Sequence, residues 1–356
     1  MTLSSLEEFW RLDLSSVSSD RAVPEAQYNR PAVGSGQVYC GGLQSEFVAA
    51  ARDDPQSVSV LDDRSAGQKT GHLSDSSVYY NATPDQPEIY FGGGYGGLYG
   101  LAADDGSNLW SQQFIVDSAV TCTPVALNGV VYFATNDGQL YAVDRVDGSA
   151  AWNEPVNVGG PVYSRLEAGN GTIYCTTLDG TVVGINEDGT EAMSFDTGTE
   201  LQASSPAFSS GTVFVAADVV YALNPDNSDP VVWRSDQASS AGYGGTVGSS
   251  PVVDASRSNI YVGSADGSVY AFDTAGGTSP WETSIGNAVP STPALGGSGD
   301  QVVAAARGGD LVVLDLGNNG TEVERVTIGS ETLSSPTVDS GEVFIGSQSG
   351  DFVGFR

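Results

Sequence analysis

A short segment that recurs along the chain constrains the fold more than any other feature of the sequence. It reads LYGLAADDGSNLW at residues 98–110 and LYAVDRVDGSAAW at residues 140–152. Each copy contains a β-rich run, an aspartate, a glycine-containing turn and, in the fuller copies, a tryptophan. Further copies lie at residues 182–193, 220–233, 269–281 and 311–326. A period of roughly 40 residues is typical of stacked or radial repeats, so the chain is interpreted as a repeat array.

A second landmark opens most units, a small residue or threonine followed by proline at the start of the first strand. It occurs at residues 123–125, 204–208, 249–253, 291–295 and 334–338, and at residues 30–33 with arginine before the proline (RPAV). Divergent copies lie near Asn81 (NATPD) and at residues 163–168 (YSRLEA). Asn-Gly and Asp-Gly pairs, which favour two-residue hairpin turns, then separate the later strands. Eight copies of a four-stranded antiparallel meander predict an all-β, eight-bladed β-propeller. Seven blades is the alternative, because an insertion hides the fourth strand of the first unit.

The last unit of the chain lacks a fourth strand, and the N-terminal segment resembles one. The chain ends at residues 351–356 in the third strand of its last unit, whereas EEFWRLDL at residues 7–14 matches the tryptophan-led fourth strands of other units. An open last blade would leave an unpaired strand edge. We therefore predict that an N-terminal strand at residues 6–14 closes the last blade.

These assignments predict one domain over residues 1–356, with a polar insertion at residues 52–77. The blades are predicted at residues 27–61, 78–116, 121–158, 162–197, 204–236, 248–285, 290–328 and 334–356. All five tryptophans then share one register, in or just before a fourth strand, and are predicted to fill the wedges between blades. They are Trp10, Trp110, Trp152, Trp233 and Trp281.

The pattern LYALDADDG…W, present here as residues 98–110 and 140–152, resembles the quinoprotein-alcohol-dehydrogenase-like propellers, whose repeats are named for pyrroloquinoline quinone (PQQ). The resemblance covers residues 6–356. It implies an eight-bladed ring in which tryptophans dock neighbouring blades. That superfamily includes quinone enzymes, non-catalytic scaffolds such as the outer-membrane-assembly propeller lipoprotein, and extracellular sensor domains. The resemblance is therefore specific for fold and not for activity.

No catalytic or metal site is predicted. The quinone enzymes hold calcium and cofactor with Glu, Asn and Asp, often beside adjacent cysteines, and no such set can be matched in this chain. No cofactor is therefore expected, with PQQ and calcium as the alternative. The only histidine, His72, lies in the polar insertion, so a Ser-His-Asp arrangement is not supported. Cys40, Cys122 and Cys175 lack metal-site spacing and are expected to be small buried thiols.

Charge excludes two classes of partner. The chain has 44 acidic and 13 basic residues, a net charge of −31, and Lys69 is its only lysine. Such a surface repels phosphate backbones and anionic lipid heads. The composition resembles that of proteins from salt-loving archaea. With no recognisable export signal or membrane span, we expect a cytoplasmic monomer, and an exported or cell-surface protein if the native N-terminus lies upstream.

Candidate ligand-binding residues lie where the copies differ. Arg30 precedes Pro31 where most units have Ser or Thr, Arg165 is aligned with the proline of its unit, and Arg307 lies in a turn where other units have small residues. These arginines are predicted to reach the central channel and bind an anion or a carbonyl-rich ligand. The alternative is that they pair with nearby Asp or Glu.

Two long glycine-rich connections complete the candidate site, one at residues 92–97 with Tyr95 and one at residues 237–248 with Tyr243. Both are expected on one face of the ring, where they would form a binding rim. The sequence thus favours a non-catalytic scaffold that binds a protein partner or a small ligand. The alternatives are a PQQ-dependent redox enzyme with its quinone in the central funnel, and a ligand-sensing domain detached from a signalling protein.

Overall fold

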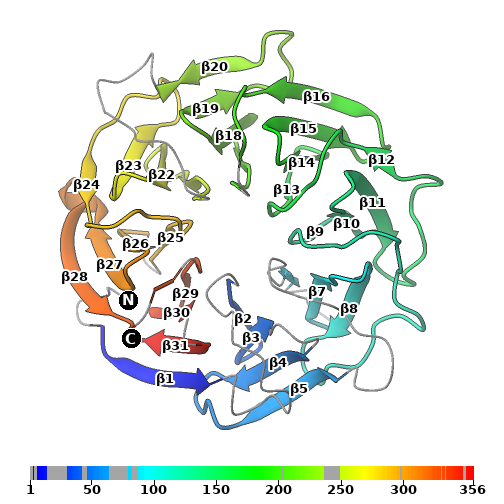
Figure 1. Ribbon diagram of the computed structural model, residues 1–356, viewed down its shortest axis with the longest axis horizontal. Coiled ribbons are helices and arrows are strands. Elements are labelled where there is room, and N and C mark those ends of the chain that lie inside the picture. Colours follow the sequence, from blue (N-terminus) through cyan, green and yellow to red (C-terminus); the bar gives the residue numbers. More distant parts are fainter. Residues whose placement is uncertain are drawn as a thin grey trace.

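Eight antiparallel sheets surround a common axis in the computed structural model (Figure 1). The structure describes residues 3, 6–13, 30–41, 46–63, 79–81, 86–201, 204–235, 249–296, 299–329, 331–332, 334–347 and 350–356. The predicted all-β, eight-bladed propeller is confirmed, and the seven-bladed alternative is wrong. No helix in this part of the chain is long and apolar enough to cross a membrane.

Blades are numbered here in the chain order of their innermost strands. Blades 1 to 4 contain β2 (Ala32–Gly34), β3 (Gln37–Gly41), β4 (Glu46–Ala51) and β5 (Val58–Asp63); β6 (Tyr79–Asn81), β7 (Glu88–Gly92) and β8 (Leu98–Ala102); β9 (Val125–Leu127), β10 (Val130–Ala134), β11 (Gln139–Asp144) and β12 (Val156–Asn157); and β13 (Glu167–Gly169), β14 (Thr172–Thr176), β15 (Thr181–Asn186) and β16 (Glu191–Asp196).

Blades 5 to 8 follow the same plan. They contain β17 (Ala207–Ser209), β18 (Thr212–Ala216), β19 (Val220–Leu223) and β20 (Val231–Arg234); β21 (Val252–Asp254), β22 (Asn259–Gly263), β23 (Ser268–Asp273) and β24 (Glu282–Ser284); β25 (Ala294–Leu295), β26 (Gln301–Ala305), β27 (Asp310–Asp315), η1 (Leu316–Asn318) and β28 (Thr321–Thr327); and β29 (Thr337–Asp339), β30 (Glu342–Gly346), β31 (Asp351–Phe355) and β1 (Glu8–Asp13).

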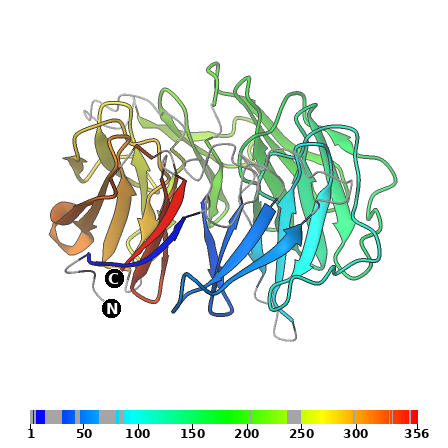
Figure 2. The ribbon, with the colours of Figure 1, turned by 60° about the horizontal axis from the view of Figure 1, so that its bottom comes forward.

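The N-terminal strand closes the ring as predicted. β1 pairs antiparallel with β31, with Trp10 opposite Gly354 and Leu12 opposite Phe352. Figures 1 and 2 show β1 beside β31 as the outermost strand of blade 8. Arg11 adds an ion pair to Asp351 at 2.6 Å. The first and last segments of the chain therefore share one sheet, which removes the open edge that a linear array of blades would have.

Blade 2 departs from the four-stranded plan. Its outer position is occupied by residues 108–114, which form isolated bridges with β8, Leu98 to Phe114 and Leu101 to Asn108, in place of a continuous ladder. Between the bridges, the Gly100 amide donates to the Gln113 side-chain oxygen at 3.1 Å. A side chain thus satisfies an amide that a regular fourth strand would have paired, and the segment can bulge outward.

Two sequence assignments in the first units need correction. Tyr79 pairs with Tyr90 as Ala207 pairs with Phe214, so the inner strand of blade 2 is β6 and Asn81 ends it. The predicted inner-strand copy starting near Asn81 is therefore wrong in register, and its residues 82–85 lie outside the described part of the chain. The predicted insertion at 52–77 contains β5, the fourth strand of blade 1. Its remaining residues 64–77, including His72, also lie outside the described residues.

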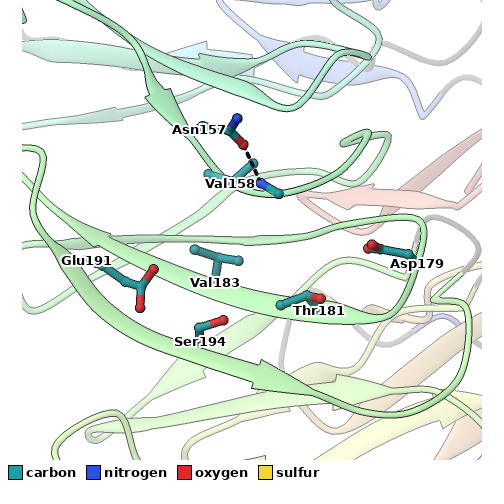
Figure 3. A pocket seen from close by; sticks show the side chains of 8 residues that line it. Asn157, Val158, Asp179, Thr181, Val183, Glu191 and Ser194 are labelled. Carbon is teal, nitrogen blue, oxygen red and sulfur yellow. Dashed lines mark hydrogen bonds between the residues drawn. The ribbon is translucent and has the colours of Figure 1, made fainter.

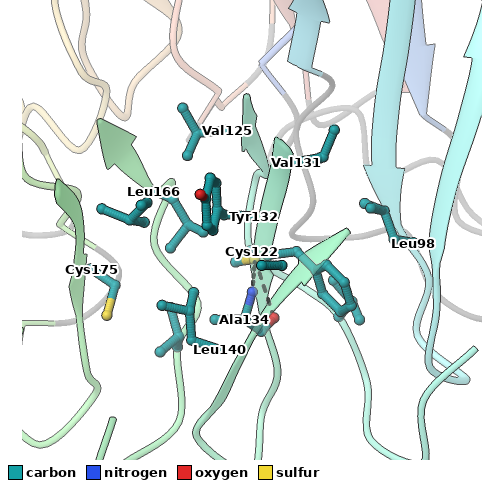
Figure 4. Packing of buried hydrophobic residues seen from close by; sticks show 14 of the residues in the cluster. Leu98, Cys122, Val125, Val131, Tyr132, Ala134, Leu140, Leu166 and Cys175 are labelled. Carbon is teal, nitrogen blue, oxygen red and sulfur yellow. Dashed lines mark hydrogen bonds between the residues drawn. The ribbon is translucent and has the colours of Figure 1, made fainter. Parts of the chain in front are cut away.

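The hydrophobic core lies mainly between blades. One cluster joins Tyr90 of blade 2 and Tyr132 of blade 3 with Cys175 of blade 4 (Figure 4). At its outer side, Trp110 and Trp152 each reach from one blade to the next. Four of the five indoles donate to a backbone carbonyl of the following blade: Trp10 to Ala51 at 3.0 Å, Trp110 to Arg145 at 3.0 Å, Trp152 to Glu187 at 2.8 Å and Trp233 to Thr274 at 2.9 Å.

The repeated glycine turns are the partners of these tryptophans. Gly277, with φ +66°, lies in the turn between β23 and β24, and a methyl group added there would overlap the Trp233 ring of blade 5. Gly320 stands in the same relation to Trp281. The turn glycine of one unit therefore adopts the positive φ of its own hairpin turn and leaves room for the tryptophan ring of the preceding unit.

This coupling predicts a large cost for Gly277→Ala. Alanine would be strained at positive φ by about 1 kcal/mol, and overlap with the indole would add about 1–3 kcal/mol. Gly211→Ala is the matched control, because Gly211 has φ +82° and no atom within 4 Å of an added methyl group. We expect denaturant unfolding to show the larger loss of stability only for Gly277→Ala.

The Trp233→Ala background supplies the second control. Truncating the indole removes the overlap, so the additional cost of Gly277→Ala should fall to that of Gly211→Ala. An unchanged cost in that background would contradict the proposed coupling.

Candidate functional site

One face of the ring, here called the upper face, carries two classes of connection. They are the turns between second and third strands and the links from each fourth strand to the next blade. Backbone hydrogen bonds join the two classes: Val120 donates to Gly93 at 3.0 Å, Leu178 to Pro161 at 2.8 Å and Arg307 to Ala288 at 2.8 Å. The turn containing Tyr95 is of the first class. Tyr243 and residues 237–248 lie outside the described residues.

At the inner end of this face, hydroxyl groups link successive blades. The residue before proline in one blade accepts a hydrogen bond from the backbone amide of the equivalent residue in the preceding blade. The amide of Arg165 donates to Ser205 at 2.9 Å, Ser205 to Ser250 at 2.8 Å, Ser250 to Thr292 at 3.2 Å and Thr292 to Ser335 at 2.9 Å. We call the four acceptors, Ser205, Ser250, Thr292 and Ser335, the hydroxyl ring. The small residue before proline therefore has a structural role.

Arg30 and Arg165 both occupy the position of the hydroxyl ring. Glu167 pairs with Tyr174 as Ala207 pairs with Phe214, which aligns Arg165 with Ser205. The prediction that Arg165 takes the proline position is therefore wrong by one residue, and Leu166 takes it. Ala32 pairs with Tyr39 in the same way, which aligns Arg30 with Ser205 as well.

The charge of Arg165 in blade 4 acts on the pKa of Arg30 in blade 1. Burial, together with the charge of Arg165, lowers the pKa of Arg30 to about 10. Arg30 Nε also donates to Thr337 Oγ1 of blade 8 at 3.2 Å. Figure 1 shows β2 and β13, the strands that follow Arg30 and Arg165, on the inner side of the ring.

Arg165 also has an acidic neighbour, as the alternative interpretation expected. Its Nη2 lies 3.4 Å from Glu167 Oε2, and its side chain is 40% exposed. Burial raises the pKa of Glu167, while the positive charge of Arg165 opposes that shift. Burial also raises the pKa of Tyr79, which lies within electrostatic reach of both residues. Arg30, Tyr79, Arg165 and Glu167 thus form one group whose charges influence one another.

Arg307 lies apart from this group. Its backbone joins the upper face, where its amide donates to Ala288 and its carbonyl accepts from Thr332 at 3.3 Å. The side chain is exposed and makes no ion pair within the described part of the chain. The structure therefore places Arg307 on the predicted face and does not bring it together with Arg30 and Arg165.

Tyr95 has an apolar neighbour that the sequence analysis missed. Tyr95 is 67% exposed and Ile115 is 56% exposed. Ile115 lies beside the turn that carries Tyr95, because a methyl group at Gly97 would lie 3.1 Å from Ile115 Cδ1. Residues 110–116 have the composition of a strand, so the sequence suggests that the isoleucine is buried. In the structure this segment forms only isolated bridges with β8, and Ile115 is exposed. An aromatic and a branched aliphatic side chain therefore share one edge of the upper face.

A polar pocket of about 280 Å³ lies between blades 3 and 4 (Figure 3). It exists beside β12, which has only two residues. Asp179 and Glu191 lie at its opposite ends, with Thr181 and Val183 between them. Among the described residues, no group of three or more His, Cys, Asp or Glu side chains is placed to hold a metal ion.

All three cysteines are buried and unpaired with one another. Cys122 takes the place of a serine in the inner wall: its Sγ accepts from the Ala134 amide at 3.1 Å and donates to the Ala134 carbonyl at 3.2 Å (Figure 4). Ser291 makes the same pair of bonds to Ala305. Burial raises the pKa of Cys122 and of Cys175 to about 12 and also raises that of Cys40.

Known proteins share both the repeat and the fold. A family model described as outer membrane protein assembly factor BamB matches residues 56–165, 96–295 and 156–356. The chain is 33% identical over 125 residues to the outer membrane protein assembly factor BamB of Burkholderia pseudomallei (strain K96243). That alignment covers 35% of this chain and 30% of the length of that protein.

Solved structures extend the likeness to the whole ring. BamB from Moraxella catarrhalis superposes with a TM-score of 0.70 at 14% identity, covering 99% of this chain and 97% of that one. The computationally designed protein Ika8 gives a TM-score of 0.73 at 16% identity over 98% and 99% of the two chains. Sqt1 of Saccharomyces cerevisiae gives 0.72 at 14% identity over 98% of each. At these identities the superpositions show the fold alone.

Thiol chemistry offers a test of the structural role of the cysteines. A thiol with a pKa near 12 carries about 1,000-fold less thiolate at pH 8 than one near its ordinary value. We expect the native protein to react with Ellman's reagent at least about 1,000-fold more slowly than an exposed cysteine does. All three thiols should react once the protein is unfolded in denaturant. A rapidly reacting thiol in the native state would contradict this role.

Proposed function

The chain belongs to the PQQ-repeat β-propeller family described as outer membrane protein assembly factor BamB, and we propose that it is a non-catalytic scaffold that binds a protein partner on its upper face. The observation that carries the proposal is the exposed pair of Tyr95 and Ile115 on that face. Large exposed apolar side chains that lie together, surrounded by polar groups, are typical of protein-binding surfaces.

The backbone around Tyr95 supports this role. The Gly93 amide donates to Gly97 at 3.1 Å, the Gly96 amide donates to Gly93 at 3.0 Å, and the Val120 amide donates to Gly93 at 3.0 Å. These bonds define the turn and attach it to the next link. Tyr95 is therefore presented on an ordered turn, which reduces the entropy lost when a partner orders the side chain.

Charge on the same face indicates the chemistry of the partner. Exposed aspartates occupy the second-to-third-strand turns of four consecutive blades, and Asp117 lies exposed just beyond Ile115. These turn aspartates are Asp137, Asp179, Asp218 and Asp266. A partner with an apolar centre bordered by Lys or Arg would complement this face. We infer that the partner is a protein with a basic, apolar-centred surface.

The quinone for which the repeats are named does not fit the described residues. Calcium takes six to eight oxygen ligands. Among the described residues, the electrostatically linked group of Arg30, Tyr79, Arg165 and Glu167 offers one carboxylate and two cations. The hydroxyl ring already accepts hydrogen bonds from the backbone. We therefore propose function without a quinone and derive no redox step.

Partner capture tests the scaffold proposal. The tagged protein would be incubated with extract of its native host at the host's salt concentration, and bound proteins would be quantified by mass spectrometry. Tyr95→Ala and Ile115→Asp should each weaken capture of the same protein about 10-fold or more, because each removes part of the apolar centre. Val146→Asp is the control, since Val146 is 79% exposed in a turn between third and fourth strands. Equal capture by all variants would exclude this surface.

Quinone binding is tested separately. Purified protein would be incubated with PQQ and calcium, desalted, and assayed by absorbance and by dye-linked alcohol oxidation. We expect no retained chromophore and no oxidation above that of free PQQ with calcium. A retained chromophore accompanied by oxidation would replace the scaffold proposal with a redox enzyme.

A further inference from the structure

We propose that the pocket between blades 3 and 4 binds a linear polyamine, a role beyond protein binding on the upper face. The pocket has a volume of about 280 Å³. Figure 3 shows Asp179 and Glu191 at its two ends, with Val183 between them. A flexible chain with a cationic amine at each end would pair with both carboxylates and fill the space between them.

Asp179 is held in place at one end of the pocket. It lies in the turn between β14 and β15, where Thr177 Oγ1 donates a hydrogen bond to Asp179 Oδ1. A methyl group added at Gly160, in the link from blade 3 to blade 4, would lie 3.0 Å from the same oxygen. The carboxylate therefore lies against the link, and it makes no ion pair with a residue that the structure describes. A cationic ligand would meet an acceptor whose position is already set, which reduces the entropy lost on binding.

Glu191 supplies the carboxylate at the other end. It is the exposed first residue of β16, and its side chain makes no hydrogen bond or ion pair within the described part of the chain. Its backbone pairs with Ile185, which lies four residues along β15 from Thr181, a span of about 13 Å. Asp179 lies beyond Thr181, in the turn that precedes β15. Carboxylates at opposite ends of such a pocket cannot share one metal ion, whose oxygen ligands lie at about 2–2.6 Å.

The middle of the pocket suits the chain of a polyamine. Val158 of blade 3 and Val183 of blade 4 line it and are buried, so they offer methylene groups an apolar contact. Ser194 pairs with Val183 in the ladder, which places the two side chains on the same face of blade 4. The hydroxyls of Ser194 and Thr181 make no hydrogen bond to a described residue and can accept from amines within the chain. A long polyamine such as spermine therefore fits better than a short diamine such as putrescine.

Isothermal titration of the purified protein with spermine tests the site. Sodium chloride is held constant, because the net charge of −31 attracts any polycation. We expect saturable binding to the wild-type protein, and binding about 10-fold or more weaker in Asp179→Asn and in Glu191→Gln, because each removes one charge-assisted pair. Putrescine is too short to reach both carboxylates, so it should bind at least about 10-fold more weakly than spermine.

Matched controls remove the same charges outside the pocket. In Asp137→Asn the aspartate lies in the equivalent turn of blade 3, where Thr135 donates to it as Thr177 does to Asp179. In Glu282→Gln the glutamate, like Glu191, is the exposed first residue of a fourth strand. Both controls should bind spermine within about 2-fold of the wild-type protein, because isolated exposed charges contribute little.

Folding of each variant is checked by its thermal transition without ligand, so that lost binding is not confused with lost structure. Absence of spermine binding to the wild-type protein, or equal affinities in the pocket and control variants, would overturn the site. Putrescine that binds as tightly as spermine would overturn the assignment to a long polyamine. A tetralysine peptide that binds more tightly than spermine, with the same dependence on Asp179 and Glu191, would overturn the assignment to a small ligand. Tyr95→Ala should leave spermine binding unchanged, so failure of this site is distinguishable from failure of partner capture.

Discussion

The contact between a tryptophan and the turn of the next blade is the interaction on which the ring depends most. A propeller blade buries its faces only against its neighbours, so the chain must specify how each blade meets the next. Trp233 does this in two ways, with a hydrogen bond to Thr274 and a ring that packs against Gly277. Because the same aspartate-glycine turn closes a hairpin and receives an indole, one repeated sequence element encodes both the blade and its docking.

Neighbouring blades are joined by different contacts at their inner and outer edges. The outer edge uses large rings, and blade 4 has Met193 at the tryptophan register, opposite Gly184 as Trp233 is opposite Ala222. The inner edge has little room, and hydroxyl groups such as Ser250 join neighbouring backbones there. A change of residue type at the inner edge therefore alters the local chemistry more than a change at the rim does. An inner residue can face side chains from several blades at once.

The repeat predicted most of the fold, since pairing and closure follow from the periodic positions of strands, turns and tryptophans. The prediction from the repeat was wrong or incomplete in units that lack the repeated proline or the regular fourth strand. Residues 163–166 lack a proline, so only the backbone pairing of Glu167 with Tyr174 shows that Arg165 replaces a hydroxyl. Ile115 was missed for a related reason. Its segment has the composition of a strand, but it pairs with β8 only at isolated bridges, and Ile115 is exposed.

The distribution of positive charge separates the axis from the rest of the molecule. Three of the described arginines on the outside of the ring pair with acids across a blade boundary: Arg52 with Asp339, Arg145 with Glu88 and Arg257 with Asp300. Such pairs are partly exposed and weaken as salt screens them. The buried contacts of the tryptophans do not depend on charge in this way, so the ring can persist in concentrated salt. Near the axis, Arg30 also joins two blades, through its hydrogen bond to Thr337, and it is buried enough that its pKa falls, so salt screens its charge less than it screens the charges at the rim.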